Sequence, residues 1–171
     1  MRGAAVSAPP IVRAARPEDL ARVGELAGQL LRQHHGFDAL RFFMPERPEE
    51  GYRWWLGKEL ANPKAVVLVA EDGGEIVGYA YARLEERDWN ALLDVHGALH
   101  DVLVDERARR RGIAKMLVEA ACARLRELGA PRVVLFTAAK NQGAQRFFDA
   151  LGFRSTMIEM TRVLPEGDEP Q

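Results

Sequence analysis

The segment from Leu99 to Leu128 constrains the fold more than any other part of the chain, because it combines a strand, a basic loop and a helix in immediate succession. Leu99 to Val104 is an apolar run of strand length, and Gly112 to Leu128 carries apolar residues at helical spacing. Gly129 follows as a C-cap residue, and Val133 to Thr137 is again strand-like. Because strand–helix–strand units join parallel strands, we expect at least one parallel pair.

The other predicted elements alternate between helical and strand-like patterns. In chain order they are a strand at Ile11–Ala15, a helix from Pro17 through Leu31, a helix at Pro48–Leu60, a strand at Ala65–Ala70, a hairpin turn at Asp72-Gly73-Gly74, a strand at Ile76–Leu84, a helix from Asn141 to Leu151 and a final strand at Phe153–Val163. The sequence therefore predicts an α+β fold with a mixed sheet flanked by helices. We expect one domain at residues 11–164, with a flexible N-terminus at 1–10 and a flexible acidic tail at 165–171.

The charge balance and the apolar patterning exclude several classes of protein. Lys and Arg number 24 and Asp and Glu 25, so a net charge of −1 draws the chain neither to nucleic acid nor to an anionic membrane. No apolar run approaches the roughly 20 residues that span a bilayer, and no signal-peptide core follows Met1. The single cysteine, Cys122, excludes an intrachain disulfide. We expect a cytoplasmic protein without nucleic-acid or membrane partners.

The histidines do not predict a metal site. His96 and His100 lie in β-rich sequence, where four residues span about 13 Å, which is too far for two ligands of one ion. His34 and His35 are adjacent on a predicted helix, so their side chains diverge. No metal is therefore expected.

The loop from Arg109 to Lys115 predicts an anion site. The first turn of a helix has backbone N–H groups without intrahelical partners, and the helix dipole adds roughly half a positive charge there. Gly112 and Ala114 are small, so an anion can approach the backbone, and three arginines precede Gly112. Together these features favour a diphosphate cradle over an ordinary solvated basic turn. The phosphate loops of nucleotide triphosphatases and dinucleotide dehydrogenases are absent.

At these residues the chain resembles the GCN5-related N-acetyltransferase (GNAT) family. The family's acetyl-CoA loop, R/Q-x-x-G-x-G/A, is matched by Arg109, Gly112 and Ala114. A second family element, N-x-x-A-x-x-F-Y/F with a later G-F, is matched by Asn141, Ala144, Phe147, Phe148, Gly152 and Phe153. The resemblance covers about residues 11 to 163. It implies a mostly antiparallel sheet with one parallel pair, and transfer of acetyl from acetyl-CoA to a primary amine.

The resemblance also assigns the acetyl-CoA contacts. The backbone amides that would hold the pyrophosphate are those of Arg110, Arg111, Gly112, Ile113, Ala114 and Lys115, beside Arg109. The backbone of Leu103 and Val104 would pair with the pantetheine arm as if it were another strand. Asn141 and Phe148 would line the other side of that arm. The alternatives are a plain helix cap for Asn141 and core packing for Phe148.

Three residues are candidates for the general base that deprotonates the amine. The family often uses a carboxylate on the strand before the loop, where this chain has Asp101 as first choice and His100 as second. Adjacent strand residues point to opposite faces, so we expect only one of them to face the active site. Glu85 on the neighbouring strand is third. Where the family often places a Tyr to protonate the leaving thiolate, this chain has Phe148, so we name no general acid.

The acceptor is expected opposite the CoA arm. The region from Leu30 to Trp55 is dense in aromatic residues, among them Phe42 and Phe43, and a loop carrying Trp89 is expected to close the other wall. We expect a small-molecule or peptide amine with an apolar part. The main alternative is a non-catalytic module that senses acyl-CoA, and nucleic-acid binding through Arg107 to Arg111 is disfavoured by the balanced charge. The sequence leaves the oligomeric state open, with a homodimer among the alternatives.

Overall fold

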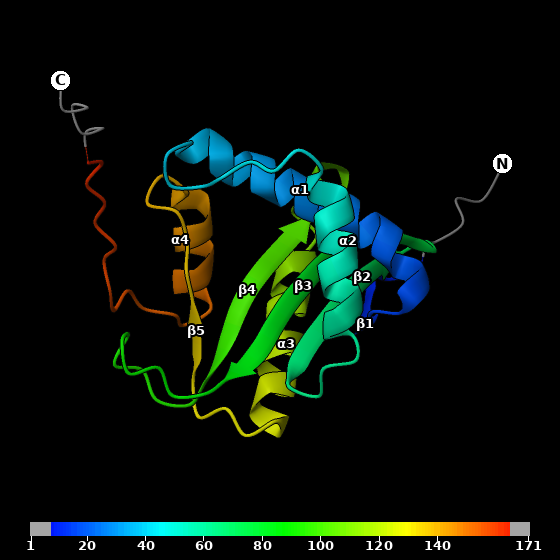
Figure 1. The fold of residues 1–171 in the computed structure, drawn as a ribbon. Helices are drawn as coiled ribbons and strands as arrows, with labels where there is room; N and C mark the ends of the chain where they lie inside the picture. The colour runs from blue at the N-terminus through cyan, green and yellow to red at the C-terminus, as the bar shows by residue number, and fades with distance from the viewer. Residues whose placement is uncertain (1–7, 165–171) are drawn as a thin grey trace, which may run out of the picture.

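The computed structural model describes residues 8–164 and shows helices on both faces of one sheet (Figure 1). The elements, in chain order, are β1 (Ile11–Ala14), η1 (Pro17–Asp19), α1 (Leu20–Phe37), α2 (Pro48–Glu59), β2 (Ala65–Asp72), β3 (Glu75–Glu85), β4 (His96–Val104), η2 (Glu106–Ala108), α3 (Ile113–Glu127), β5 (Val133–Leu135) and α4 (Gln142–Ala150). Most of the expected N-terminal lead-in and the whole expected tail at 165–171 lie outside the described residues.

The sheet has five strands in the order β1-β2-β3-β4-β5. All neighbours are antiparallel except β4 and β5, which confirms the predicted mixed sheet with one parallel pair. The parallel pairing covers only three residue pairs, from Gly97 with Val133 to Leu99 with Leu135. Since β4 continues to Val104, its second half has no strand partner on that side among the described residues.

Alternation along the central strands divides the core into two layers. On one face, Leu68 and Ala80 pack against α3, as does much of the apolar side of β4. On the other face, Val69, Tyr79 and Tyr81 pack against α1 and α2. Figure 1 shows α3 behind the sheet and both early helices in front of it. The middle of β4 therefore faces α1. The start of α3 lies next to the end of β4.

One glycine allows α3 to lie close to β4. A Cβ atom built on Gly97 would lie 2.7 Å from Cδ1 of Leu125, a residue of α3 that is fully buried. Real Cβ atoms do not approach that closely, so any side chain at this position would push the helix and the strand apart.

The predicted final strand, Phe153–Val163, is wrong. No strand forms between residues 153 and 164, and the large side chains of Met157, Ile158 and Met160 are 75%, 84% and 91% exposed. An extended segment becomes a strand only when a neighbouring strand accepts its backbone hydrogen bonds, and this segment has no such neighbour among the described residues. The other predicted elements are present with boundaries shifted by a few residues.

Two glycine-to-alanine changes should have opposite effects on stability. We expect Gly97→Ala to lower the free energy of unfolding by about 1–3 kcal/mol, because its methyl group would overpack against Leu125. Gly51 lies within α2, and a Cβ atom at this position would have nothing within 4 Å, so Gly51→Ala should raise it by up to about 1 kcal/mol. Urea unfolding followed by circular dichroism measures both, and equal shifts would contradict the close-approach argument.

Candidate functional site

A β-bulge in the middle of β4 brings two candidate bases to the same side of the sheet. Asp101 pairs with Tyr81 and Leu99 pairs with Ala82, so His100 is an extra residue between two register positions. The His100 ring stacks on Tyr81 at 5.2 Å between centroids. Asp101 accepts a hydrogen bond from the hydroxyl of Tyr79, at 3.2 Å. The expectation that only one of His100 and Asp101 faces the site is therefore wrong, because the bulge interrupts the strand alternation on which it rested.

The electrostatics of Asp101 suit a base. Burial raises the pKa of this carboxyl to about 6, and the hydrogen bond from Tyr79 opposes that rise. Burial also raises the pKa of Tyr79 well above 10, so the phenol keeps its proton and remains a donor. Burial and the charge of Asp101 likewise raise the pKa of Tyr52. A carboxyl with a pKa near 6 is ionised at neutral pH yet holds a proton more strongly than an ordinary aspartate.

His100 and Glu85 form a second pair beside Asp101. Nε2 of His100 lies 3.3 Å from Oε1 of Glu85, within hydrogen-bond range when Nε2 carries the proton. Tyr81, on which His100 stacks, is itself held by a buried hydrogen bond of 2.7 Å from its hydroxyl to Glu59. All three predicted bases thus lie within one cluster. Asp101 and His100 line the pocket, and Glu85 contacts His100 without lining the pocket.

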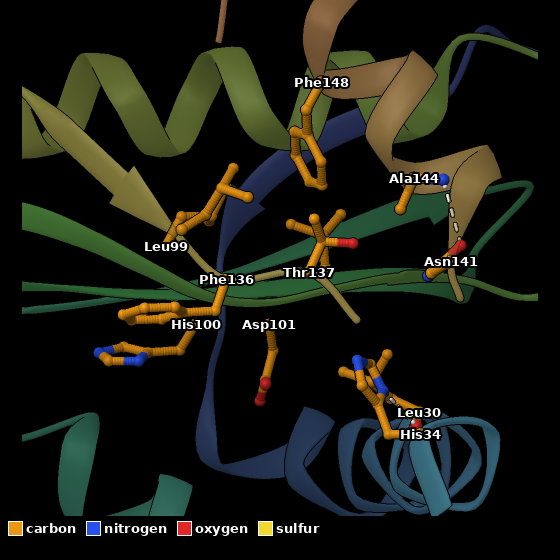
Figure 2. A pocket seen from close by; sticks show the side chains of 12 residues that line it. Leu30, His34, Leu99, His100, Asp101, Phe136, Thr137, Asn141, Ala144 and Phe148 are labelled. Atoms are coloured by element: carbon orange, nitrogen blue, oxygen red, sulfur yellow. Dashed lines mark hydrogen bonds between the residues drawn. The ribbon is translucent and has the colours of Figure 1, made fainter. Parts of the chain in front are cut away.

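A small, open pocket of about 70 Å³ lies where β4 and β5 diverge (Figure 2). Its lining residues come from α1, β4, the end of β5 and α4, and they are Leu30, His34, Leu99, His100, Asp101, Val102, Leu135, Phe136, Thr137, Asn141, Ala144 and Phe148. Figure 2 shows the Asp101 carboxylate pointing into the space between β4 and α1, with Phe148 on the opposite side of the strand. The pocket therefore connects the α4 side of the sheet with the α1 side.

Asn141 and Phe148 both line this pocket and both have structural contacts. The Asn141 side chain accepts a hydrogen bond of 3.1 Å from the backbone N–H of Ala144 and so caps α4. Phe148 packs edge-on against Phe147 and Phe153, at centroid distances of 5.1 and 5.5 Å. Asn141 therefore caps α4 and Phe148 packs in the core, and both residues still line the pocket.

Thr137 lines the pocket but was not predicted from the sequence. Its Oγ1 atom is buried and has no hydrogen-bond partner within residues 8–164. A buried hydroxyl without a partner is costly unless a ligand or water completes it. In the sequence Thr137 only ends an apolar run, so no local signal could have identified it. His34 also lines the pocket, and the sequence placed it in the aromatic region from Leu30 to Trp55 without assigning it a role.

The start of α3 presents a set of open backbone donors. Met116 makes the first bond of the helix, from its N–H to the carbonyl of Gly112 at 3.1 Å. Within the described chain, the N–H groups from Arg110 to Lys115 have no acceptor. Arg110 and Gly112 have positive φ values of 62° and 77°, and nothing lies within 4 Å of the Cβ position at Gly112. The loop therefore fits an anion at its backbone.

The arginine side chains are only partly available for that anion. Arg111 forms an ion pair with Asp72, and Arg109 donates from Nε to the carbonyl of Val104 at 3.2 Å. Arg110 forms no ion pair within the part of the chain that the structure describes. The expected positive charge thus comes from backbone amides and Arg110 more than from three free guanidinium groups.

Buried Asp105 fixes the turn that leads into this loop. Its side chain accepts from the backbone N–H of Arg107 at 3.0 Å and forms ion pairs with Arg107 and Arg22 at 3.2 and 2.5 Å. These contacts hold the pKa of Asp105 well below its usual range, with the hydrogen bonds of Arg107 as the largest cause. The preceding residues Leu103 and Val104 end β4, and their backbone lies beyond the pairing with β5.

The three predicted acceptor residues do not line the pocket. Phe42 packs edge-on against His34 at 5.0 Å and so borders a lining residue. Phe43 and Trp89 are each 75% exposed, and Trp89 lies in a loop closed by a single bridge between Asp88 and Leu93. Their role in acceptor binding stays a prediction.

Membrane-spanning helices and metal-binding clusters are both lacking in the described residues. None of their helices combines the length and the apolar character needed to cross a membrane. No group of three or more His, Cys, Asp and Glu side chains among them is arranged to hold a metal ion.

Known proteins are similar to this chain in sequence and in fold. D-amino-acid N-acetyltransferase HPA3 of Saccharomyces cerevisiae is 24% identical over 148 residues, which are 86% of this chain and 87% of that protein. The BH1408 tetramutant from Bacillus halodurans matches with a TM-score of 0.76 at 24% identity, over 90% of this chain and 99% of that one. Aminoglycoside N-acetyltransferase AAC(6')-Iy in complex with CoA matches with a TM-score of 0.75 at 21% identity, over 92% and 95%.

The family model described as the acetyltransferase (GNAT) family matches residues 29–153. That range includes the β4 bulge, the loop at residues 109–115 (the anion loop), the pocket and the Asn141 cap of α4. It is more than half of the chain. The resemblance seen in the sequence motifs is therefore confirmed: the chain belongs to the acetyltransferase (GNAT) family, a family of acetyl-CoA-dependent N-acyltransferases.

Proposed function

We propose that this protein transfers the acetyl group of acetyl-CoA to a primary amine by direct attack within a ternary complex. The observation that carries the proposal is the position of Asp101. Its carboxyl, with a pKa of about 6, lies in the pocket that opens beside the free half of β4. The anion loop begins just beyond the end of that strand, so donor and base share one site.

Acetyl-CoA, the acetyl donor, fits the residues between the anion loop and the pocket. The open N–H groups from Arg110 to Lys115 would bind the pyrophosphate. The backbone of Leu103 and Val104, which pairs with β3 but has no strand partner on the β5 side, would pair with the pantetheine arm on that side. Asn141 and Phe148 lie across the pocket from β4. Bound acetyl-CoA supplies an activated thioester carbonyl.

The acceptor would enter from the α1 side, where Leu30 and His34 face Asp101. An alkylammonium group has a pKa near 10.4, so it must lose a proton before it attacks. Asp101 would accept that proton directly or through a water molecule. The amine nitrogen then bonds to the acetyl carbonyl carbon and the carbon–sulfur bond breaks, so CoA leaves as a thiolate. The nitrogen loses its second proton to become the amide, and that proton ends on the thiolate, directly or through water. A thiol pKa of about 8.5 makes that thiolate a fair leaving group without a dedicated acid.

The acceptor is proposed to be a small or medium amine with an apolar part. The pocket mixes Leu30, Leu99 and Phe148 with the polar groups of His34 and Asp101, which suits an amine attached to an apolar group. Two similar proteins support a small molecule: one is named for D-amino acids and another for aminoglycosides. A non-catalytic acyl-CoA sensor would release no CoA when amines are added, whereas the proposed enzyme releases it.

The anion loop can be tested with a matched pair of glycine variants. We expect Gly112→Glu to abolish acetyl-CoA binding, because it places bulk and negative charge among the open N–H groups. Gly129→Glu is the control: it lies just after the other end of α3, with φ of 96° and open space around its Cβ position, so it carries a comparable backbone strain of about 1–2 kcal/mol. Isothermal titration calorimetry measures both. Unchanged affinity in folded Gly112→Glu would remove the pyrophosphate from this loop.

Asp101→Asn tests the base. We expect kcat at pH 7.5 to fall by roughly 100- to 10,000-fold while acetyl-CoA affinity stays nearly unaltered. In the wild type, kcat/KM should rise with pH through about 6 as the carboxyl ionises, and the variant should lose that limb. Steady-state kinetics with any acceptor found by a CoA-release screen gives both readouts. Normal kinetics in the variant would transfer the assignment to His100 or Glu85, tested as His100→Ala and Glu85→Gln.

The same substitution should change how stability depends on pH. The pKa of Asp101 is raised in the folded state, so the folded protein loses stability as pH rises from about 4 to about 6 and this half-buried carboxyl ionises. Asn cannot ionise, so the free energy of unfolding of the variant should not fall over that interval. Relative to the wild type it should rise by at most about 3 kcal/mol, the equivalent of two pKa units. Urea unfolding of both proteins at pH 4 and pH 8 measures the difference. If that difference is independent of pH, the folded protein does not raise the pKa of this carboxyl.

A further inference from the structure

Thr137 carries a buried hydroxyl that has no partner in the part of the chain that the structure describes. Its Oγ1 atom and Nε of Arg83 are the two buried side-chain atoms of residues 8–164 that could form a hydrogen bond and do not. Thr137 comes directly after Phe136, just beyond the end of β5, and lines the pocket. Because a buried hydroxyl is costly without a partner, its place in the pocket indicates a partner that arrives with the ligand.

The register of the parallel strands places Thr137 across the pocket from Asp101. The last paired residues are Leu99 of β4 and Leu135 of β5. Asp101 and Thr137 lie two residues further along their own strands, where the two strands no longer pair. Figure 2 shows Asp101 on the α1 side of β4 and Thr137 on the side of Phe148. The two side chains therefore flank the opening between the strands from opposite sides.

The direction of acetyl transfer gives these two sides different tasks. The amine approaches the carbonyl carbon from the side of its base, Asp101, and the sulfur leaves on the other side of that carbon. Negative charge develops on the sulfur as the carbon–sulfur bond breaks, and a hydrogen-bond donor beside the sulfur stabilises that charge. On this side of the pocket Phe148 has no polar group, whereas Thr137 has an unoccupied hydroxyl.

We propose that the Thr137 hydroxyl donates a hydrogen bond to the sulfur of acetyl-CoA and so stabilises the CoA thiolate as it leaves. This inference rests on the proposed function and extends it to the leaving group. The hydroxyl keeps its own proton, because an aliphatic alcohol is a far weaker acid than a thiol with a pKa of about 8.5. The proton that finally reaches the thiolate is the second proton of the amine nitrogen. Thr137 thus supplies a donor, but no proton, in a chain that has Phe148 where the family often places Tyr.

Three threonine variants test this contact in the transfer reaction. Thr137→Val keeps the shape of the side chain and removes the hydroxyl. We expect the single-turnover rate of acetyl transfer to fall roughly 10- to 100-fold, while acetyl-CoA affinity measured by calorimetry changes little. Thr137→Ser keeps the hydroxyl and should recover most of the lost rate. Thr161→Val, at an exposed threonine that does not line the pocket, is the control.

Two outcomes of these kinetics would overturn the proposal. A normal transfer rate in Thr137→Val would show that the hydroxyl does not act on the leaving group. Weaker acetyl-CoA binding with an unchanged single-turnover rate would place the hydroxyl on another part of the CoA arm.

CoA binding gives a second test that needs no acceptor. CoA and desulfo-CoA, which has hydrogen in place of the thiol, differ only at the sulfur, so the ratio of their affinities isolates the contribution of that group. At pH 9 we expect this ratio to be roughly tenfold larger in the wild type than in Thr137→Val, because the thiolate accepts the hydrogen bond. At pH 6, where the sulfur carries its proton, the two proteins should differ much less. Equal ratios at pH 9 would contradict the contact.

The stability of the free protein separates this role from a structural one. Thr137→Val exchanges an unpartnered hydroxyl for a methyl group, so its urea unfolding midpoint should be higher than that of the wild type. A lower midpoint would show that the hydroxyl already has a partner in the free protein, contrary to the proposal. The binding ratio and the midpoint need no acceptor. If no amine releases CoA, the proposed transfer fails, and these two measurements still decide whether Thr137 contacts the sulfur.

Discussion

The organisation of the site depends on the short parallel contact between β4 and β5. The two strands pair at only three positions and then separate, while β4 continues for five more residues. Beyond Leu99 the β4 backbone therefore keeps hydrogen-bonding groups that no strand satisfies on that side within the described chain. Such groups are costly when buried without partners, so a ligand that pairs with them as a strand would be favoured. The pocket, the bulge and the anion loop all lie along this separated half of β4.

The electrostatic cost of placing a carboxyl at Asp101 supports its proposed role as the base. Its burial raises the pKa to about 6, which means that the folded state opposes the ionised form at neutral pH. Tyr79 offsets part of that cost by donating a hydrogen bond to the carboxylate. A residue placed only for stability would gain more as an apolar side chain or as an exposed carboxylate. The arrangement is therefore easier to explain by proton transfer than by packing.

In the anion loop, the arginine side chains and the backbone N–H groups have different roles. The side chains with the chemistry to bind phosphate, those of Arg109 and Arg111, are held by Val104 and Asp72 and so fix the shape of the loop. The open donors are backbone N–H groups, which the positive φ values at Arg110 and Gly112 help to expose. Backbone donors at a helix start are rigid and add the helix dipole, so they suit a diphosphate without many free arginines.

The sequence by itself determined what depends on neighbouring residues: the strand–loop–helix unit at Leu99 to Leu128, the small residues of the anion loop and the cap at Asn141. Those signals are set by local backbone preferences, so they are readable without the fold. Only the tertiary structure decided what depends on register and on distant partners. The bulge that turns His100 and Asp101 to one side arises from pairing with β3, and the unsatisfied hydroxyl of Thr137 follows from burial. The segment after Phe153 has the pattern of a strand, but a strand also requires a neighbouring strand to pair with, and local sequence cannot show where that partner lies.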